Sequence, residues 1–204
     1  KLTGRKKSDK INSGFLTEKK KSIFFEQLSI WIRGNLFIPD ARKYWIKPSI
    51  KLLKAYIKKN QVDVIISSGP PHSTHLIAYD LATCFNIPWI ADFRDPWTNI
   101  DFYDELLLTN WADKKHKKLE KLVLNNADVT LTIGQTLAKE LKELGAKRVE
   151  IVENGYDPSD IKEDKLNLDD KFTIAHIGSF TPSRNIDSFW IAISELLKED
   201  ESFL

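Results

Sequence analysis

The residues best suited to chemistry in this sequence follow a short apolar segment at 87–91, which the pattern predicts to be a buried strand. Asp92, Arg94, Asp95 and Trp97 come directly after it. Charges at such a position are costly unless they pair with each other or face a ligand. The planar guanidinium of Arg94 suits a carboxylate, a phosphate or sugar hydroxyls, and Asp92 or Asp95 could hold it. Trp97 could stack on a sugar ring.

We therefore predict that Asp92, Arg94 and Trp97 bind substrate. Arg94 and Asp95 are also candidate catalytic residues. A purely structural Arg–Asp pair in the loop is the alternative interpretation.

A second candidate loop spans residues 67–75 and joins a predicted strand to the start of a helix. Free backbone N–H groups and the helix dipole at such a junction favour an anion or a hydroxyl group. Gly69 and His72 are therefore predicted to line a substrate site, with an ordinary Gly-Pro-Pro turn and a capped helix as the alternative. The loop has neither the GxGxxG pattern of dinucleotide-binding proteins nor the GK[ST] of a P-loop. His72 and His75 have no third ligand nearby in the sequence, so we expect no metal site.

A third loop begins at the end of a predicted strand at 172–178 and leads to a predicted helix at 186–198. It contains Gly178, Ser179 and Arg184. Small residues followed by an arginine at a helix start suit a diphosphate group. We predict that these three residues bind the phosphates of a ligand, although small residues also form ordinary turns of this kind.

Predicted strands and helices alternate between these loops. The predicted strands are 62–67, 87–91, 127–133 and 149–152, and the predicted helices are about 72–85, 105–124 and 136–144. This alternation indicates an α/β fold with a doubly wound, parallel, Rossmann-like sheet. Ligands bind such sheets at the carboxyl ends of the strands, which is where the loops after residues 67 and 91 would lie.

The charges of the chain are unevenly placed. The 204 residues carry 31 Lys/Arg and 29 Asp/Glu, for a net charge of +2. Residues 1–60 hold 16 basic and 4 acidic residues, a net +12, whereas residues 61–204 hold 15 and 25, a net −10. A nucleic-acid-binding protein would be more basic overall, so we expect no nucleic-acid partner.

The basic part contains an aromatic segment at 23–37, in which Phe24, Leu28, Trp31 and Ile32 share one side of a predicted helix. The segment is too short and too often interrupted by charge to cross a bilayer. Two interpretations stay open. The helix either faces the core, or it lies on an anionic membrane surface with lysines around it.

The next predicted helix starts near Pro48 and continues the positive charge through several lysines. Ile50, Leu53 and Ile57 recur at helical spacing, so we predict that they form a buried stripe.

The sulfur-containing residues and the start of the chain bear on its location. The chain has one cysteine and no methionine. A single cysteine fits a reducing cytosol, and the first residues lack a secretory signal. The lack of methionine indicates a piece of a longer protein. We therefore expect a cytoplasmic protein, peripheral on the inner face of the membrane if the basic segment binds lipid.

Four segments, taken in order, resemble the family 4 retaining glycosyltransferases, which have the GT-B fold. The matching segments are 62–71, 87–97, 153–157 and 176–185. The resemblance covers about residues 38–200. It implies an acceptor-side Rossmann-like domain followed by a second one that binds a nucleotide sugar.

The resemblance also implies a division of the chain and further roles. The implied parts are a basic segment 1–37, an acceptor-side domain 38–156, an acidic linker 157–170 and the start of a donor-binding domain at 171–204. Asn154 would lie at the crossover between the domains and bind substrate. Gly178, Ser179 and Arg184 would lie beneath the donor diphosphate.

The reaction that the resemblance implies is transfer of a sugar, with retention, from a nucleotide-sugar donor to a lipid-linked or polysaccharide acceptor. No cofactor is expected besides these substrates. Many members have a histidine at the position that corresponds to Arg94 in this chain, so the role of that histidine is not transferred. The family's Glu-x7-Glu motif would lie beyond Leu204, and we expect the fragment alone to be inactive. The alternatives are a nucleotide-sugar epimerase of GT-B fold and a non-catalytic α/β binding module.

Overall fold

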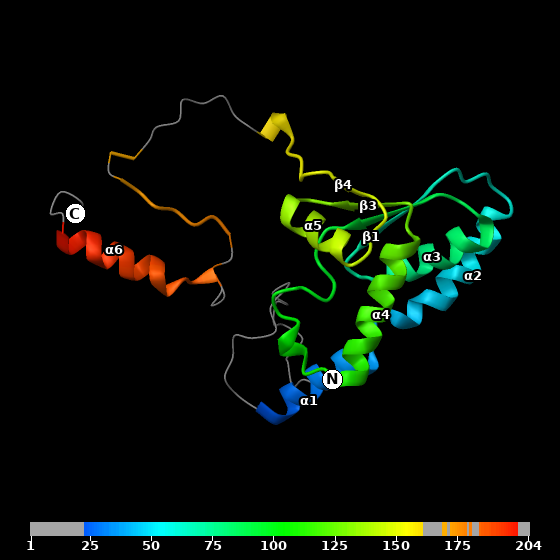
Figure 1. Cartoon of the computed structure of the whole chain (residues 1–204), viewed down its shortest axis with the longest axis horizontal. Helices are drawn as coiled ribbons and strands as arrows, with labels where there is room; N and C mark the ends of the chain where they lie inside the picture. Colours follow the sequence, from blue (N-terminus) through cyan, green and yellow to red (C-terminus); the bar gives the residue numbers. More distant parts are fainter. Residues whose placement is uncertain (1–22, 161–168, 171, 179, 181–183, 200–204) are drawn as a thin grey trace. The chain divides into compact units, whose positions relative to one another are not determined.

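The computed structural model describes residues 23–160, 169–170, 172–178, 180 and 184–199. The chain divides into two compact units, one ending at Gly155 and the other beginning at Tyr156. Every strand of the described residues lies in the first unit, and helix α6 (Asp187–Glu199) lies in the second (Figure 1).

The described residues of the first unit form a four-stranded parallel sheet. Its strands are β1 (Ile65–Gly69), β2 (Trp89–Phe93), β3 (Val129–Thr132) and β4 (Val149–Ile151). They lie side by side in chain order, with Ser67 beside Ala91 and Ala91 beside Thr130. The predicted α/β fold with a parallel, Rossmann-like sheet is confirmed.

Three strands begin later than the sequence pattern predicts, β1 at Ile65, β2 at Trp89 and β3 at Val129. Pro88 has no N–H group to give to a ladder, so β2 begins after it. The carbonyl of Pro88 accepts the N–H of Ile65 at 2.9 Å, which fixes where pairing starts. Ser68 and Gly69 were predicted as loop, but they extend β1 because β2 offers their backbone a partner.

Three helices connect the strands. They are α3 (Ser73–Phe85), α4 (Asn110–Asn126), which follows the short 3-10 helix η2 (Asp104–Leu106), and α5 (Gln135–Glu143). Right-handed crossovers between strands that advance in one direction place the helices on one face of the sheet. The core lies there: Trp89, Ala91 and Phe93 of β2 form one cluster with Val123 of α4 and Leu141 of α5.

The opposite face of the sheet carries apolar side chains that the described residues cover only in part. Ile66 is 64% exposed and Val64 is 44% exposed. β1 is the edge strand, paired with β2 alone. This face of the first strand is therefore open in the described residues.

Helix α1 (Ile23–Leu36) contacts the rest of the unit through its last turn, at η2 and α4. Gly34 and Asn35 are buried there, whereas Phe24 is 71% and Leu28 41% exposed. The core-facing interpretation of the aromatic side is therefore wrong, because the first half of the helix has no element of the described chain beside it. Neither α1 nor any other helix in the described ranges has the length and apolar content that a membrane crossing requires.

Helix α2 (Ile46–Ile57) follows the 3-10 helix η1 (Lys43–Trp45) and packs against α3. The predicted stripe is only half covered: Ile50 and Ile57 are half-buried and Leu53 is 37% exposed. A single neighbouring helix leaves the flanks of such a stripe open, so the expectation of a fully buried stripe is wrong.

In the second unit, α6 matches the predicted helix at 186–198 to within one residue at each end. A short 3-10 helix, η3 (Pro158–Asp160), lies near its start. The predicted strand at 172–178 does not form. A parallel strand needs a neighbour for its hydrogen bonds, and all the strands of the described residues belong to the first unit.

Candidate functional site

Three of the predicted site residues lie along the carboxyl edge of the sheet. Arg94 follows β2, and its backbone N–H donates to the carbonyl of Gly69 at the end of β1, with N and O 3.1 Å apart. Asn154 lies three residues after the end of β4. The carboxyl ends of parallel strands share one edge, so loops far apart in the sequence meet here.

The side chain of Arg94 spans this edge. Its guanidinium donates a hydrogen bond to the side-chain oxygen of Asn154, so it reaches from the end of β2 past β3 to the segment after β4. Both side chains are exposed. A guanidinium has five N–H donors, and the contact with Asn154 leaves most of them for an oxyanion or for hydroxyl groups.

The two carboxylates near Arg94 do not hold it. Asp92 accepts a hydrogen bond from the hydroxyl of Ser68, with the oxygens 2.8 Å apart, and it lies on the sheet face opposite the helices. Asp95 is exposed and has no hydrogen bond or ion pair to any other described residue. The alternative of an Arg–Asp pair is therefore not what the structure shows, since Asn154 takes the place of the carboxylate.

Gly69, His72 and Trp97 lie in a buried layer beneath this edge. The rings of His72 and Trp97 stack, with centroids 4.5 Å apart and planes 2° apart. His72 is 8% and Trp97 4% exposed. In this arrangement one face of the indole is taken by His72, so these two rings support the loops from within.

His75 extends the buried layer toward the sheet. Its Nδ1 shares a hydrogen bond of 2.8 Å with the hydroxyl of Ser67, and that oxygen also accepts the indole N–H of Trp89 at 2.8 Å. The ring stacks on Phe93, with centroids 4.7 Å apart. Nε2 of His75 and Nδ1 of His72 have no hydrogen-bond partner among the described residues. Both nitrogens lie against the α-carbon of Gly69.

Burial keeps these histidines neutral. It lowers the pKa of His72 from 6.5 to about 4, with a smaller contribution from the charge of His116. It lowers the pKa of His75 from 6.5 to about 3, with a smaller contribution from His72. At neutral pH the layer beneath the strand ends is therefore uncharged, and the charges of the site lie on the exposed edge.

His116 on α4 is a third buried histidine that the sequence analysis did not select. The indole N–H of Trp97 donates to its Nδ1 at 3.1 Å, so the proton of the neutral ring is on Nε2. Nε2 then donates to the carbonyl of Gly34 at 3.4 Å. This residue links the loop after β2 to α1, and its place in a lysine-rich helix gave no sign of that.

The start of α3 is also occupied from within the chain. The carboxylate of Asp40 accepts the backbone N–H of Ser73, with N and O 2.7 Å apart. The hydroxyl of Thr74 donates to the carbonyls of Ser68 and Pro71, at 2.8 Å each. The sequence analysis predicted that this helix start could bind an anion, but the carboxylate of Asp40 already occupies one of its N–H groups. This contact could not be predicted, because Asp40 and Ser73 are far apart in the sequence.

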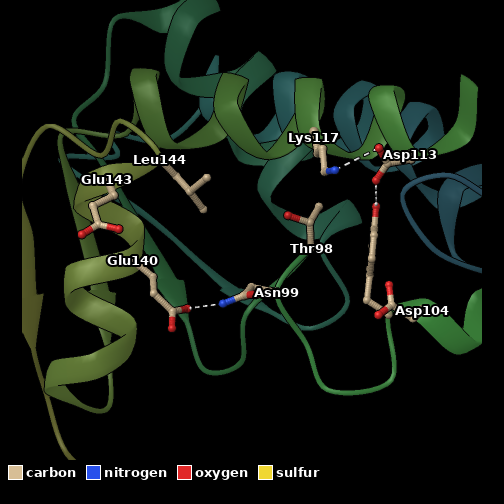
Figure 2. A pocket seen from close by; sticks show the side chains of 9 residues that line it. Thr98, Asn99, Asp104, Asp113, Lys117, Glu140, Glu143 and Leu144 are labelled. Atoms are coloured by element: carbon tan, nitrogen blue, oxygen red, sulfur yellow. Dashed lines mark hydrogen bonds and ion pairs between the residues drawn. The ribbon is translucent and has the colours of Figure 1, made fainter. Parts of the chain in front are cut away.

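A pocket of about 410 Å³ lies elsewhere, between the loop after β2 and helices α4 and α5 (Figure 2). Its lining residues are Thr98, Asn99, Tyr103, Asp104, Asp113, Lys117, Glu140, Glu143 and Leu144. The side-chain N–H of Asn99 donates to Glu140 at 2.7 Å, and Asp113 accepts from Tyr103 at 3.1 Å and pairs with Lys117 at 2.9 Å. The pocket holds none of the predicted site residues and its polar groups largely satisfy each other, so we place the candidate site at the strand ends.

Thr98, one of the lining residues, is hydrogen-bonded to a buried carboxyl group. Glu120 is 2% exposed and accepts hydrogen bonds from the hydroxyl of Thr98 at 2.5 Å and from its backbone N–H at 3.3 Å. Burial raises the pKa of Glu120, and the bonds from Thr98 partly oppose the shift. Glu120 therefore secures the loop after β2, together with Trp97 and His116.

The predicted phosphate-binding residues belong to the second unit. Gly178 has φ +133°, in the left-handed region that favours glycine. Arg184 is exposed, at the start of the segment that leads into α6. Ser179 lies outside the described residues.

Comparison with known proteins gives one finding. Neither the curated proteins nor the solved structures yielded a match. The sequence model described as Glycosyltransferase Family 4 matches residues 15–160, which is most of the chain. The matched range includes β1 to β4, Arg94 and Asn154. This match supports a glycosyltransferase-type function and supports neither an epimerase nor a non-catalytic binding module. The chain therefore belongs to glycosyltransferase family 4.

Proposed function

We propose that this chain is the acceptor-side part of an enzyme that transfers a sugar from a nucleotide-sugar donor to a lipid-linked or polysaccharide acceptor. Its place would be cell-envelope or polysaccharide biosynthesis, at the cytoplasmic face of the membrane. Membership of the family supports the transferase class. The observation that carries the position of the site is the exposed guanidinium of Arg94, held by Asn154 across the strand ends.

Each residue of the edge has a role in this proposal. Arg94 binds a phosphate or sugar hydroxyls of the acceptor, because it presents a rigid, charged fork of donors. Asn154 positions Arg94 by accepting one of its N–H groups. Asp92 accepts hydrogen bonds from sugar hydroxyls, as it already does from Ser68. Asp95, exposed beside Arg94, is the carboxylate placed to take part in proton transfer.

The buried layer has a supporting role. Gly69, His72 and Trp97 hold the loops after β1 and β2 against each other, through the contact of Gly69 with the imidazole rings and the stacking of His72 on Trp97. Their effect on substrate binding is indirect, through the position of Arg94.

The donor belongs to the second unit in this proposal. Gly178, Ser179 and Arg184 bind the diphosphate of the nucleotide sugar, and no cofactor is needed besides the two substrates. The described residues of this unit form one α-helix and no strand. Because no sheet fixes the position of these residues, we propose that the chain on its own transfers no sugar.

Calorimetric titration tests the acceptor site. The probe is a water-soluble, short-chain lipid diphosphate that carries one sugar. Arg94→Ala should weaken its binding about tenfold to a hundredfold, the usual worth of a hydrogen bond to a charged group. Arg94→Lys should recover part of the loss, because it restores the charge but not the planar fork.

The matched control is Arg148→Ala. Arg148 is an exposed arginine of the same unit that pairs with Glu150 at 2.8 Å. The Arg148→Ala variant should bind the probe as tightly as the unchanged chain does. Equal weakening by both alanine variants would mean that the probe responds to charge in general. Failure of the unchanged chain to bind the probe would contradict the proposed acceptor class.

A further inference from the structure

Helix α2 has two apolar sides, and among the described residues only one of them packs against another helix. The inner side, with Ile50 and Ile57 half-buried, packs against α3. An ion pair fixes this packing, since Nζ of Lys54 lies 2.6 Å from a carboxylate oxygen of Asp80 on α3. The orientation of the helix is therefore set, and its other side faces away from the domain.

The outer side presents large apolar residues to solvent. Trp45 is 48% exposed, Leu52 72% and Tyr56 57%. Residues that are seven and four positions apart lie on one face of a helix. Tryptophan and tyrosine combine an apolar ring with a polar N–H or O–H group, which suits them to the boundary between lipid and water.

A row of lysines lies between the inner side of α2 and this apolar face. Lys47, Lys51 and Lys58 are four and seven positions apart and all exposed. Within the described ranges none of them has an ion pair. At ~100° per residue, these lysines lie ~100–140° around the helix from Leu52, and their long side chains can reach past its flank. The ammonium groups can therefore extend to lipid headgroups while the apolar side chains enter the acyl region.

The apolar surface continues from α2 toward α1. The amine of Lys43 lies 4.8 Å from the ring centre of Tyr44 and 5.3 Å from that of Phe37, and it donates to the carbonyl of Leu36. Tyr44 is 71% and Leu36 52% exposed. Farther along α1, Phe24 and other apolar residues are exposed as well.

The charge around α2 indicates which kind of partner could cover its outer face. Residues 23–60 contain eight Lys/Arg and two Asp/Glu, and α2 itself contains no acidic residue. A second copy of the chain would therefore bring lysines against lysines, which is unfavourable. An anionic lipid surface offers a dense layer of opposite charge directly above an apolar layer, which matches lysines beside Trp45, Leu52 and Tyr56.

From these observations we propose that the outer face of α2 docks on an anionic lipid bilayer. The helix lies in the plane of the membrane, with Leu52 and the rings of Trp45 and Tyr56 inserted and Lys47, Lys51 and Lys58 on the headgroups. This inference deepens the proposed function and rests on it for its purpose, which is to bring the strand ends to a lipid-linked acceptor.

Vesicle sedimentation of the full chain tests the inference. The vesicles are phosphatidylcholine alone, or equal parts of phosphatidylcholine and phosphatidylglycerol. The chain should bind the anionic vesicles and not the neutral ones, and added salt should weaken the binding. The combined change Lys47→Gln, Lys51→Gln and Lys58→Gln should weaken it about a hundredfold, from about fivefold for each lysine.

The matched control removes the same charge from another helix. Lys114, Lys118 and Lys121 are exposed on α4 and take part in no ion pair of the described residues. Their combined change to Gln should weaken binding less than about threefold. Equal losses from α2 and α4 would mean that net charge alone drives binding, and would overturn the proposal.

The apolar contribution is tested with Leu52→Ala together with Tyr56→Ala. Both side chains are largely exposed, so the fold should persist, which circular dichroism checks. Vesicle binding should fall at least tenfold, and unchanged binding would overturn the proposed insertion. If instead sedimentation without lipid shows a dimer that this double variant abolishes, the face is an interface between copies and the proposal is wrong. No sugar is present in these assays, so their outcome is independent of the Arg94 titration.

Discussion

At the scale of single residues, Gly69 is where the packing at the strand ends is tightest. A β-carbon there would lie 2.6 Å from Nε2 of His75 and 3.1 Å from Nδ1 of His72. Neither ring can easily give way, because His75 is held by Ser67 and Phe93, and His72 is stacked on Trp97. The requirement for glycine is therefore one of space rather than of backbone conformation.

We predict that Gly69→Ala lowers the free energy of unfolding by about 1–3 kcal/mol, the usual cost of overpacking a buried site. Urea denaturation measures the change. Gly155→Ala is the control, because a β-carbon at Gly155 meets nothing within 4 Å. It should change stability by less than about 0.5 kcal/mol. Equal effects of the two substitutions would contradict the packing described here.

The sequence indicated which residues lie at the strand ends, but it did not indicate which of their side chains are exposed and which are buried. Arg94 and Asn154 were selected separately, and the structure joins them. The burial of Trp97 could not be foreseen, because it depends on His72 and His116 from two other helical segments. Such contacts form only when the fold is complete, and no local pattern records them.

At the scale of elements, the side chain of Asn35 attaches the end of α1 to the rest of the unit. Asn35 is 2% exposed, and its side-chain N–H groups donate to the carbonyls of Trp31 at 2.9 Å and Leu107 at 3.1 Å. Its side-chain oxygen accepts the backbone N–H of Thr109 at 2.7 Å and the hydroxyl at 2.8 Å. Since Thr109 caps α4, Asn35 connects the end of α1 to the start of α4.

We predict that Asn35→Ala destabilises the protein by about 2–3 kcal/mol, because it leaves buried donors and acceptors without partners. Amide hydrogen exchange in α1 should accelerate more than exchange in β2. Asn60→Ala is the matched control, since Asn60 is exposed and donates only to the carbonyl of Tyr56. Uniform acceleration of exchange across α1 and the sheet would contradict a local attachment.

The order of the elements was predictable, whereas some of their limits and one strand were not. Apolar runs and helical spacing located β2 to β4, α3, α5 and α6 to within two residues, because these patterns reflect local burial, whereas α4 begins at Asn110 and not near residue 105. The strand expected at 172–178 fails because Phe172 to Gly178 have strand-like residues but no neighbouring strand. The exposure of Phe24 on α1 likewise depends on what lies beside the helix, which periodicity cannot tell.

At the scale of the whole molecule, buried neutral histidines make stability depend on pH. The pKa values of His72 and His75 fall to about 4 and about 3 in the folded chain, below the ordinary 6.5. Burial lowers the pKa of His116 too. Between pH 6.5 and these values the unfolded chain binds more protons, so acid favours unfolding. The raised pKa of Glu120 acts in the opposite direction, but one carboxyl offsets only part of the effect.

We predict that stability is constant above about pH 7 and falls by about 2–4 kcal/mol by about pH 5. Urea denaturation at both values measures the difference. His72→Gln should reduce the pH dependence, because it removes one of the buried rings that gain a proton on unfolding. Equal stability at both pH values would contradict the neutral, buried layer beneath the strand ends.

The uneven charge of the chain also corresponds to different parts of the fold. Residues 1–60 carry a net charge of +12. The described part of this range contains α1, α2 and the segment between them, where apolar side chains are exposed. The sheet and its loops belong to the acidic remainder, in which Arg94 is an isolated exposed cation after β2. Lipid and acceptor would thus meet different surfaces of the first unit.

Arg94 gives the most direct test of the proposed acceptor site. The measurement is the ¹⁵N NMR signal of its guanidinium Nε–H, assigned by its loss in Arg94→Lys, while the short-chain lipid diphosphate sugar is added. We predict a saturable shift of the Arg94 signal and none of the Arg148 signal. No shift at Arg94, or an equal shift at Arg148, would contradict an acceptor site at the carboxyl ends of the strands.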